Sequence, residues 1–121
     1  MRKIIYLISP DNINFKFYVS LDKVLSFGNV KFFQLRTKNI KKDKLFKIIK
    51  KLKKITKKHK VIFILNDDYK YAFKIKADGC HMGQSDGSLK DARKKLKNKI
   101  LGVTCHSSKV LAFNALKYNA D

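Results

Sequence analysis

Short apolar runs separated by longer amphipathic stretches recur along the whole chain. Five apolar runs begin at intervals of roughly 20 to 30 residues, the spacing of strands that alternate with helices. These runs cover residues 4–8, 30–35, 61–65, 79–82 and 100–104. The amphipathic stretches cover residues 21–27, 41–58, 69–76, 89–97 and 109–118. We predict strands buried on both faces for the first set and helices for the second.

The clearest helical pattern lies in residues 41–58. Apolar residues recur there at the i, i+3, i+4, i+7 spacing of one helix face, and lysines cover the rest. The apolar positions are Leu45, Ile48, Ile49, Leu52 and Ile55. Strand followed by helix, repeated five times, predicts parallel strands joined by right-handed crossovers, and hence an α/β fold. For a chain of 121 residues we expect a single domain over residues 1–121.

Polar residues cluster where each predicted strand ends, and ligands of parallel α/β sheets bind at the carboxyl ends of the strands. The clusters cover residues 9–12, 36–39, 66–68, 83–86 and 105–108. Alternation along a strand also gives three of the runs a polar or open face. These faces hold Gln34, Arg36 and Lys38; Gly79, His81 and Gly83; and Gly102, Thr104 and His106.

If these strand faces point into the interior of a barrel, their polar residues would converge at one open end of that barrel. The converging residues would be Arg36, Lys38, Asn66, His81 and Thr104. The alternative is the exposed strand face of an α+β domain, which the helical stretches on both sides of each run disfavour.

The acidic residues are few, and all nine are Asp. Asp67 and Asp86 end neighbouring predicted strands, where two oxygen ligands suit a Mg²⁺ ion that keeps most of its waters and binds substrate phosphates. Arg36 and Lys38 would bind the same phosphates, which is typical of pyrophosphate chemistry. The alternative is that these aspartates only cap helices or turns, and this applies most to Asp68.

The formal net charge of +20 raises nucleic acid or an anionic membrane surface as partners. Only Arg2, Arg36 and Arg93 among the 29 basic residues are Arg, whereas specific phosphate and base recognition favours the bidentate Arg fork. No aromatic residue interleaves the lysines of residues 50–58, so we interpret them as a solvated helix face. We therefore expect neither nucleic acid nor a membrane as a partner.

The two cysteines, Cys80 and Cys105, are too few for a disulfide framework. Each precedes a His, yet adjacent strand residues point to opposite faces, which disfavours a shared zinc ion and cysteine nucleophile chemistry. We predict both as small buried hydrophobes. No apolar signal segment opens the chain and no apolar run approaches a membrane span, so we expect a soluble, cytoplasmic protein.

Five segments together resemble one known family. They are Tyr-Leu-Ile-Ser at 6–9, Gln-Leu-Arg-Thr-Lys at 34–38, Leu-Asn-Asp at 65–67, Ala-Asp-Gly-Cys-His-Met-Gly-Gln-Ser-Asp at 77–86 and Leu-Gly-Val-Thr-Cys-His-Ser at 101–107. They resemble the thiamine phosphate synthases and the related thiazole tautomerases, which share a TIM barrel fold. The resemblance runs from about Lys3 onward, and its fourth segment is the most specific.

This resemblance implies a transferase of thiamine biosynthesis. It would condense hydroxymethylpyrimidine diphosphate with thiazole phosphate, release pyrophosphate and use Mg²⁺, with Asp67 and Asp86 as the metal ligands. The matching substrate positions are Gln34, Arg36, Lys38 and Asn66 for the pyrimidine diphosphate, His81 for the pyrimidine pocket and Thr104 for the pyrophosphate. No general acid or base is assigned, because a dissociative substitution depends more on stabilising the departing anion.

The chain also departs from the family pattern. Thr37 stands where an acidic residue is common, and Asp68 where a basic one is common. Only about five of the eight βα units of such a barrel are matched, so we expect a partial barrel with two open strand edges. Such a chain would lack the thiazole phosphate site, could be inactive and could form homo-oligomers.

Two other functions stay open. A thiazole tautomerase would need no metal carboxylates and could use His106 as its acid or base, although retention of both Asp67 and Asp86 favours the synthase. A basic module that holds nucleic acid through its lysines is the less favoured alternative.

Overall fold

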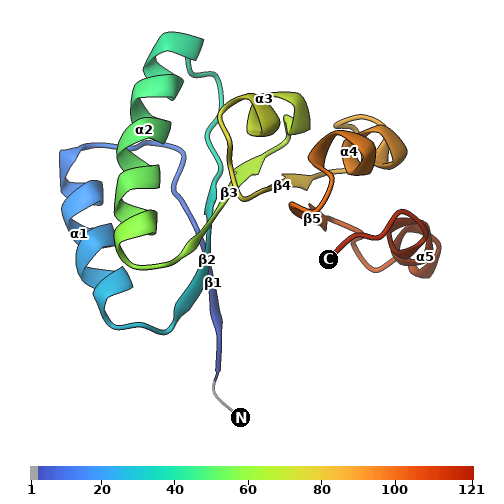
Figure 1. Ribbon diagram of the computed structural model, residues 1–121, viewed down its shortest axis with the longest axis horizontal. Coiled ribbons are helices and arrows are strands. Elements are labelled where there is room, and N and C mark those ends of the chain that lie inside the picture. Colours follow the sequence, from blue (N-terminus) through green and yellow to red (C-terminus); the bar gives the residue numbers. More distant parts are fainter. Residues whose placement is uncertain (1–2) are drawn as a thin grey trace. The chain divides into compact units, whose positions relative to one another are not determined.

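The computed structural model describes residues 3–121, in which strand and helix alternate five times (Figure 1). The strands are β1 (Ile5–Ile8), β2 (Val30–Leu35), β3 (Ile62–Asn66), β4 (Gly79–Met82) and β5 (Ile100–Val103). The helices are α1 (Phe15–Ser26), α2 (Lys42–Lys58), α3 (Tyr69–Lys74), α4 (Leu89–Leu96) and α5 (Lys109–Lys117). Strand order follows chain order, and the pairs β1–β2, β3–β4 and β4–β5 are parallel. The predicted α/β class is confirmed.

Helix α1 is longer than the pattern predicted. It begins at Phe15 rather than near Leu21, because Asn14 caps it: the Asn14 side-chain oxygen accepts a hydrogen bond of 3.0 Å from the backbone N–H of Phe17. A cap of this kind satisfies one of the backbone donors that a helix N-terminus leaves without partners.

Two compact units make up the chain. One ends at Phe63 and the other runs from Ile64 to Asp121, so the boundary falls within β3. The single domain expected over residues 1–121 stays a prediction, and residues 1 and 2 lie outside the described part. No helix within residues 3–121 combines the length and the apolar character needed to cross a membrane.

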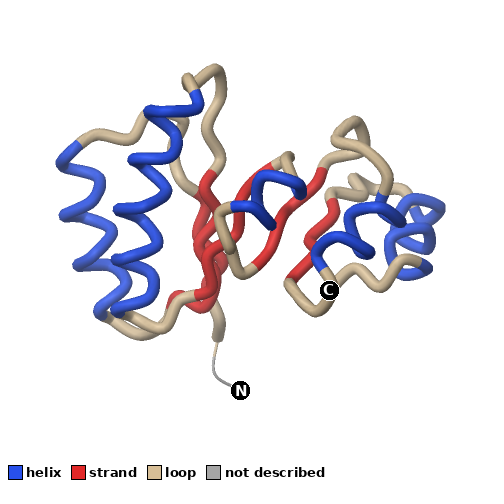
Figure 2. Tube along the Cα trace, turned by 45° about the horizontal axis from the view of Figure 1, so that its top comes forward, coloured by secondary structure: helices blue, strands red, loops and turns tan. Residues whose placement is uncertain are grey.

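In the first unit, α1 and α2 run side by side (Figures 1 and 2). The predicted apolar stripe of α2 buries Ile48, Ile49 and Leu52, and its remaining members Leu45 and Ile55 are half-buried. The core also contains Leu21, Leu25, Phe33, Leu35 and Phe63. Burial of such side chains removes apolar surface from water, which stabilises each by about 1.5–3 kcal/mol.

Strand β1 differs from its prediction as a strand buried on both faces. Ile5, Tyr6 and Ile8 are exposed. The strand lies at the end of the strand order and has one hydrogen-bonded neighbour, so fewer elements cover its side chains.

The second unit is fastened by Arg93 of α4. Its guanidinium donates hydrogen bonds to the carbonyl oxygens of Lys97, Lys99 and Asn119 and to the Asp121 carboxylate. The same Asp121 oxygen accepts a bond of 2.9 Å from the backbone N–H of Leu101 in β5. One side chain thus links the ends of α4 and α5 to β5. The planar guanidinium of Arg, with its several N–H donors in fixed directions, suits this role better than a Lys ammonium.

Candidate functional site

In the second unit, His81 and Thr104 meet at the carboxyl ends of β4 and β5. The imidazole Nε2 and the Thr104 hydroxyl oxygen share a hydrogen bond of 2.8 Å, whose direction depends on the imidazole tautomer. Gly102 makes room for this ring, since a Cβ there would lie 2.6 Å from His81 Nδ1. The open face predicted from alternating glycine and polar residues is therefore occupied by the imidazole.

Asp67 and Asp86 are both anchored to the end of β4. The Asp67 backbone N–H donates to the His81 carbonyl oxygen at 2.7 Å. The Asp86 carboxylate accepts from the backbone N–H of Gly83 at 2.6 Å. Because His81 and Gly83 are two residues apart, these bonds bring both acidic residues to one strand end, where Asn66 is also paired in register with His81.

Asp67 has a left-handed backbone, with φ at +73°. This conformation is energetically unfavourable for a residue with a Cβ, although Asp and Asn tolerate it better than most residues. Strained backbone of this kind concentrates at functional sites.

Asp68 has a structural role. It is the N-cap of α3, and its carboxylate accepts a hydrogen bond of 2.8 Å from the backbone N–H of Tyr71. For this residue the capping alternative is confirmed, whereas Asp67 and Asp86 cap no described helix.

The carboxylates influence Cys80, which is fully buried in β4. Burial is the main cause that raises the pKa of this thiol to about 12, and the nearby charges of Asp68, Asp67 and Asp86 raise it further. The prediction of a small buried hydrophobe is confirmed for Cys80. Cys105 lies beyond the end of β5 and is only half-buried, so the prediction is wrong for it.

Among residues 3–121, no group of three or more His, Cys, Asp or Glu side chains is arranged to hold a metal ion. Mg²⁺ differs from other metals in that one or two carboxylates suffice, with waters and substrate phosphates as its other ligands. The donor chemistry of Asp67 and Asp86 fits an ion of that type.

In the first unit, Ser9 holds the end of β2. Its hydroxyl accepts from the Arg36 N–H at 2.9 Å and donates to the Arg36 carbonyl oxygen at 3.3 Å, and its own N–H donates to the Gln34 carbonyl oxygen. Gln34 is buried, and its amide nitrogen donates to the Tyr6 hydroxyl at 3.0 Å. The side chains of Arg36 and Lys38 are exposed.

The strands end earlier than the predicted alternation requires. Arg36 and Lys38 follow β2, and Thr104 and His106 follow β5. His106 is exposed and has a left-handed backbone, with φ at +49°. A shared strand face therefore does not extend to Arg36, Lys38 or His106, because alternation of side chains applies only to extended backbone.

Residues 5–121 match a family model described as thiamine monophosphate synthase. The chain belongs to this family. Among curated relatives, it is 54% identical over 123 residues to the thiamine-phosphate synthase of Pelagibacter ubique, covering 99% of the chain and 58% of the relative. It is 40% identical over 120 residues to the thiamine-phosphate synthase of Erythrobacter litoralis, covering 97% of the chain and 56% of the relative.

A solved structure of this family has the same fold. Thiamine phosphate pyrophosphorylase from Pyrococcus furiosus superposes with a TM-score of 0.83 at 27% identity, over 99% of the chain and 57% of that protein. The chain thus spans a little over half the length of these relatives. Five βα units of the family's TIM-barrel-like fold are present, as the sequence predicted.

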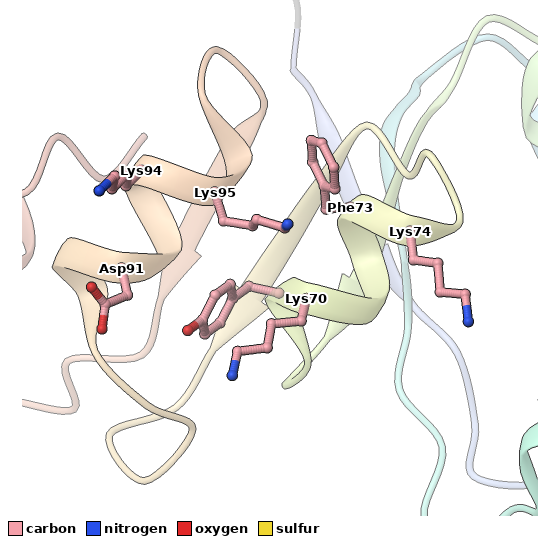
Figure 3. Close-up of a pocket in the computed structure, with 7 residues that line it drawn as sticks. Lys70, Phe73, Lys74, Asp91, Lys94 and Lys95 are labelled. Carbon is pink, nitrogen blue, oxygen red and sulfur yellow. The ribbon is translucent and has the colours of Figure 1, made fainter.

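A hollow of about 730 Å³ lies between α3 and α4, and no residue of the family motifs is among those that line it (Figure 3). It is lined by Tyr69, Lys70, Phe73, Lys74, Asp91, Lys94 and Lys95. The Lys95 ammonium lies 4.6 Å from the centre of the Phe73 ring. None of the predicted site residues lines this hollow, so its size alone does not make it the site of the family's chemistry.

Sequence reasoning overlooked the side chains of Tyr6, Ser9 and Gln84, each of which contacts a predicted site residue. All three lie inside the segments that carry the family resemblance. Each of them bonds a side chain or a backbone group in another segment. The spacing of motifs along the chain does not specify which segments come into contact.

Proposed function

We propose that this chain belongs to an enzyme that condenses hydroxymethylpyrimidine diphosphate with thiazole phosphate, giving thiamine phosphate and pyrophosphate. The observation that carries the proposal is the attachment of Asp67 and Asp86 to the same strand end, beside His81 and Thr104. The names of the relatives support the synthase over the tautomerase.

Asp67 and Asp86 would hold Mg²⁺. When bound, the ion neutralises negative charge on the diphosphate and so favours its departure. The ion would be shared with the substrate, because two carboxylates leave most of its coordination positions to water and phosphate oxygens.

The substrate roles follow the family motifs. Gln34, Arg36, Lys38 and Asn66 would bind the pyrimidine diphosphate, His81 would line the pyrimidine pocket, and the Thr104 hydroxyl would donate to the pyrophosphate. The Ser9 hydroxyl bonds the backbone of Arg36 and would thereby fix the position from which the Arg36 side chain extends. The C–O bond to the diphosphate would break first, with both bonding electrons leaving on the diphosphate, and the thiazole nitrogen would then capture the resulting pyrimidine carbocation. In such a reaction the chain's main task is to stabilise a departing anion.

The proposal is tested by measuring pyrophosphate release from the two substrates, with and without Mg²⁺, using the protein as encoded. We expect release to require the metal, and Asp67→Asn or Asp86→Asn to lower kcat/KM by at least about tenfold. Asp43→Asn is the matched control, because Asp43 is an exposed residue in the first turn of α2.

Tautomerisation of a thiazole phosphate without pyrophosphate release would contradict the synthase and favour the tautomerase. In that case His106→Asn should abolish activity and Asp86→Asn should not. Small molecules as substrates, Mg²⁺ as cofactor and a homo-oligomeric state are likewise parts of this proposal.

A further inference from the structure

Thr104 is held by three hydrogen bonds from β4 and the loop that follows it. Its backbone N–H donates to the Met82 carbonyl oxygen at 2.9 Å. Its hydroxyl bonds His81 Nε2 at 2.8 Å. Its carbonyl oxygen accepts from the Gln84 side-chain amide at 2.6 Å. The first bond continues the β4–β5 pairing beyond Val103, whereas the other two depend on side chains.

The loop that carries Gln84 is itself closed by Asp86. The Asp86 carboxylate accepts from the Gly83 N–H at 2.6 Å, and the Asp86 N–H donates back to the Gly83 carbonyl oxygen at 3.4 Å. Gln84 lies between these two residues, so its bond to Thr104 ties the Asp86 loop directly to the end of β5. Displacement of either segment would strain this short contact.

We infer that Gln84 is a positioning residue for the diphosphate site, which acts by fixing the Thr104 hydroxyl relative to the Asp86 loop. This inference rests on the proposed function. Gln84 suits the task because its amide nitrogen donates to a carbonyl at the strand end, and because this hydrogen bond uses the Thr104 backbone and not its hydroxyl. The Thr104 hydroxyl thus keeps capacity for His81 and for a ligand.

The side chain of Gln84 is exposed, so its bond contributes little to global stability. The expected effect is therefore local. Loss of the donor would leave the fold intact and let the β5 end move relative to Asp86, which would weaken ligand binding through misplacement of Thr104.

The test measures binding of magnesium pyrophosphate by calorimetry to the wild-type protein and to Gln84→Met, which keeps the length of the side chain and removes the donor. We expect the Kd to rise about three- to tenfold, with an unchanged urea midpoint. Gln84→Glu, which replaces the donor by an acceptor, should act in the same direction. Ser85→Ala, at an exposed neighbour in the same loop, is the matched control and should bind like the wild type.

A double-mutant cycle separates positioning from a general effect. If Gln84 acts through the Thr104 hydroxyl, Gln84→Met should raise the Kd by less than about twofold in a Thr104→Val background. An equal fold-change in both backgrounds, or none in either, would overturn the inference, as would absence of pyrophosphate binding by the wild type. If pyrophosphate binds as expected but the substrates release none, the proposed function fails while the inference about Gln84 survives.

Discussion

Several described residues of this chain hold a left-handed backbone without being glycine, and Asp67 is one of those at the candidate site. Its φ of +73° turns the chain immediately after β3, while its N–H donates to the His81 carbonyl oxygen. The backbone strain and the carboxylate therefore belong to the same residue. Substitutions can separate the two, because side chains differ both in charge and in tolerance of positive φ.

We predict that Asp67→Asn is nearly as stable as the wild type, whereas Asp67→Ala loses about 1 kcal/mol of unfolding free energy. Asn tolerates the left-handed conformation, and Ala does not. Urea unfolding measures the difference. Both variants should lose magnesium-dependent pyrophosphate release, because both lack the carboxylate. An alanine variant as stable as the wild type would show that the turn carries no strain.

The two cysteines should differ in reactivity. Burial, followed by the charges of Asp68, Asp67 and Asp86, raises the pKa of Cys80 to about 12, so its thiol stays protonated at neutral pH. Since the thiolate is the reactive form, iodoacetamide at mildly alkaline pH should label Cys105 in the native protein and both cysteines in denaturant. Mass spectrometry counts the labels, and native labelling of Cys80 would contradict its burial.

The same pKa gives a pH dependence of stability. The Cys80 thiol has a higher pKa in the folded protein than in the unfolded chain. Its contribution to the free energy of unfolding is therefore fully present below the pKa of the unfolded thiol and is lost as the pH rises toward about 12. A Cys80→Ala variant should lack this alkaline loss. Its smaller side chain would lower stability equally at all other pH values.

At the scale of elements, helices end on lysine where glycine is usual. Lys60 and Lys76 follow the ends of α2 and α3 with φ values of +56° and +54°. Glycine is the common residue at this position because it has no Cβ to clash. The chain contains only five glycines, so these helix ends adopt the left-handed conformation at a cost.

Replacing Lys60 by Gly should raise the unfolding free energy by about 0.5–1 kcal/mol, since relief of the left-handed strain exceeds the added entropy of the unfolded chain. Lys57→Gly is the matched control: it lies within the last turn of α2, where glycine should destabilise by about 1 kcal/mol. Urea midpoints of the two variants should move in opposite directions. A loss of stability in both would show that Lys60 has a favourable contact that outweighs its backbone strain.

At the scale of the whole molecule, the net charge of +20 is the dominant electrostatic property. Much of it lies on the exposed side of α2, where Lys50, Lys51 and Lys54 are solvated and the apolar stripe faces the core. Lysines in that arrangement form a solvated helix face, and no aromatic residue interleaves those of residues 50–58 as single-strand binding would require.

We therefore predict weak retention on duplex or single-stranded nucleic acid at physiological salt. Changing Lys50, Lys51, Lys53 and Lys54 to Gln should leave that retention almost unaltered, apart from a shallower salt dependence. Fluorescence anisotropy with labelled oligonucleotides at several salt concentrations measures both. Tight binding that the substitutions abolish would favour the basic-module alternative instead.

The order and type of the elements could be predicted from sequence because each depends on a local period. The boundaries of β2 and β4 were predicted residue for residue. The early start of α1 was missed because the apolar periodicity is weak near Phe15 and the signal there is the Asn14 cap. The burial of β1 was wrong because burial depends on which elements cover a strand.

Sequence by itself determined the α/β class, the family and the residue types of the site, since periodicity and motif segments are properties of the chain. Only the tertiary structure decided which neighbours meet: His81 with Thr104, Asp86 with Gly83, and Gln84 with the Thr104 carbonyl. It also separated Asp68, a helix cap, from its neighbour Asp67, which follows β3 and donates its N–H to the His81 carbonyl oxygen of β4. The physical reason is that a hydrogen bond depends on distance and direction in space, and the fold sets both.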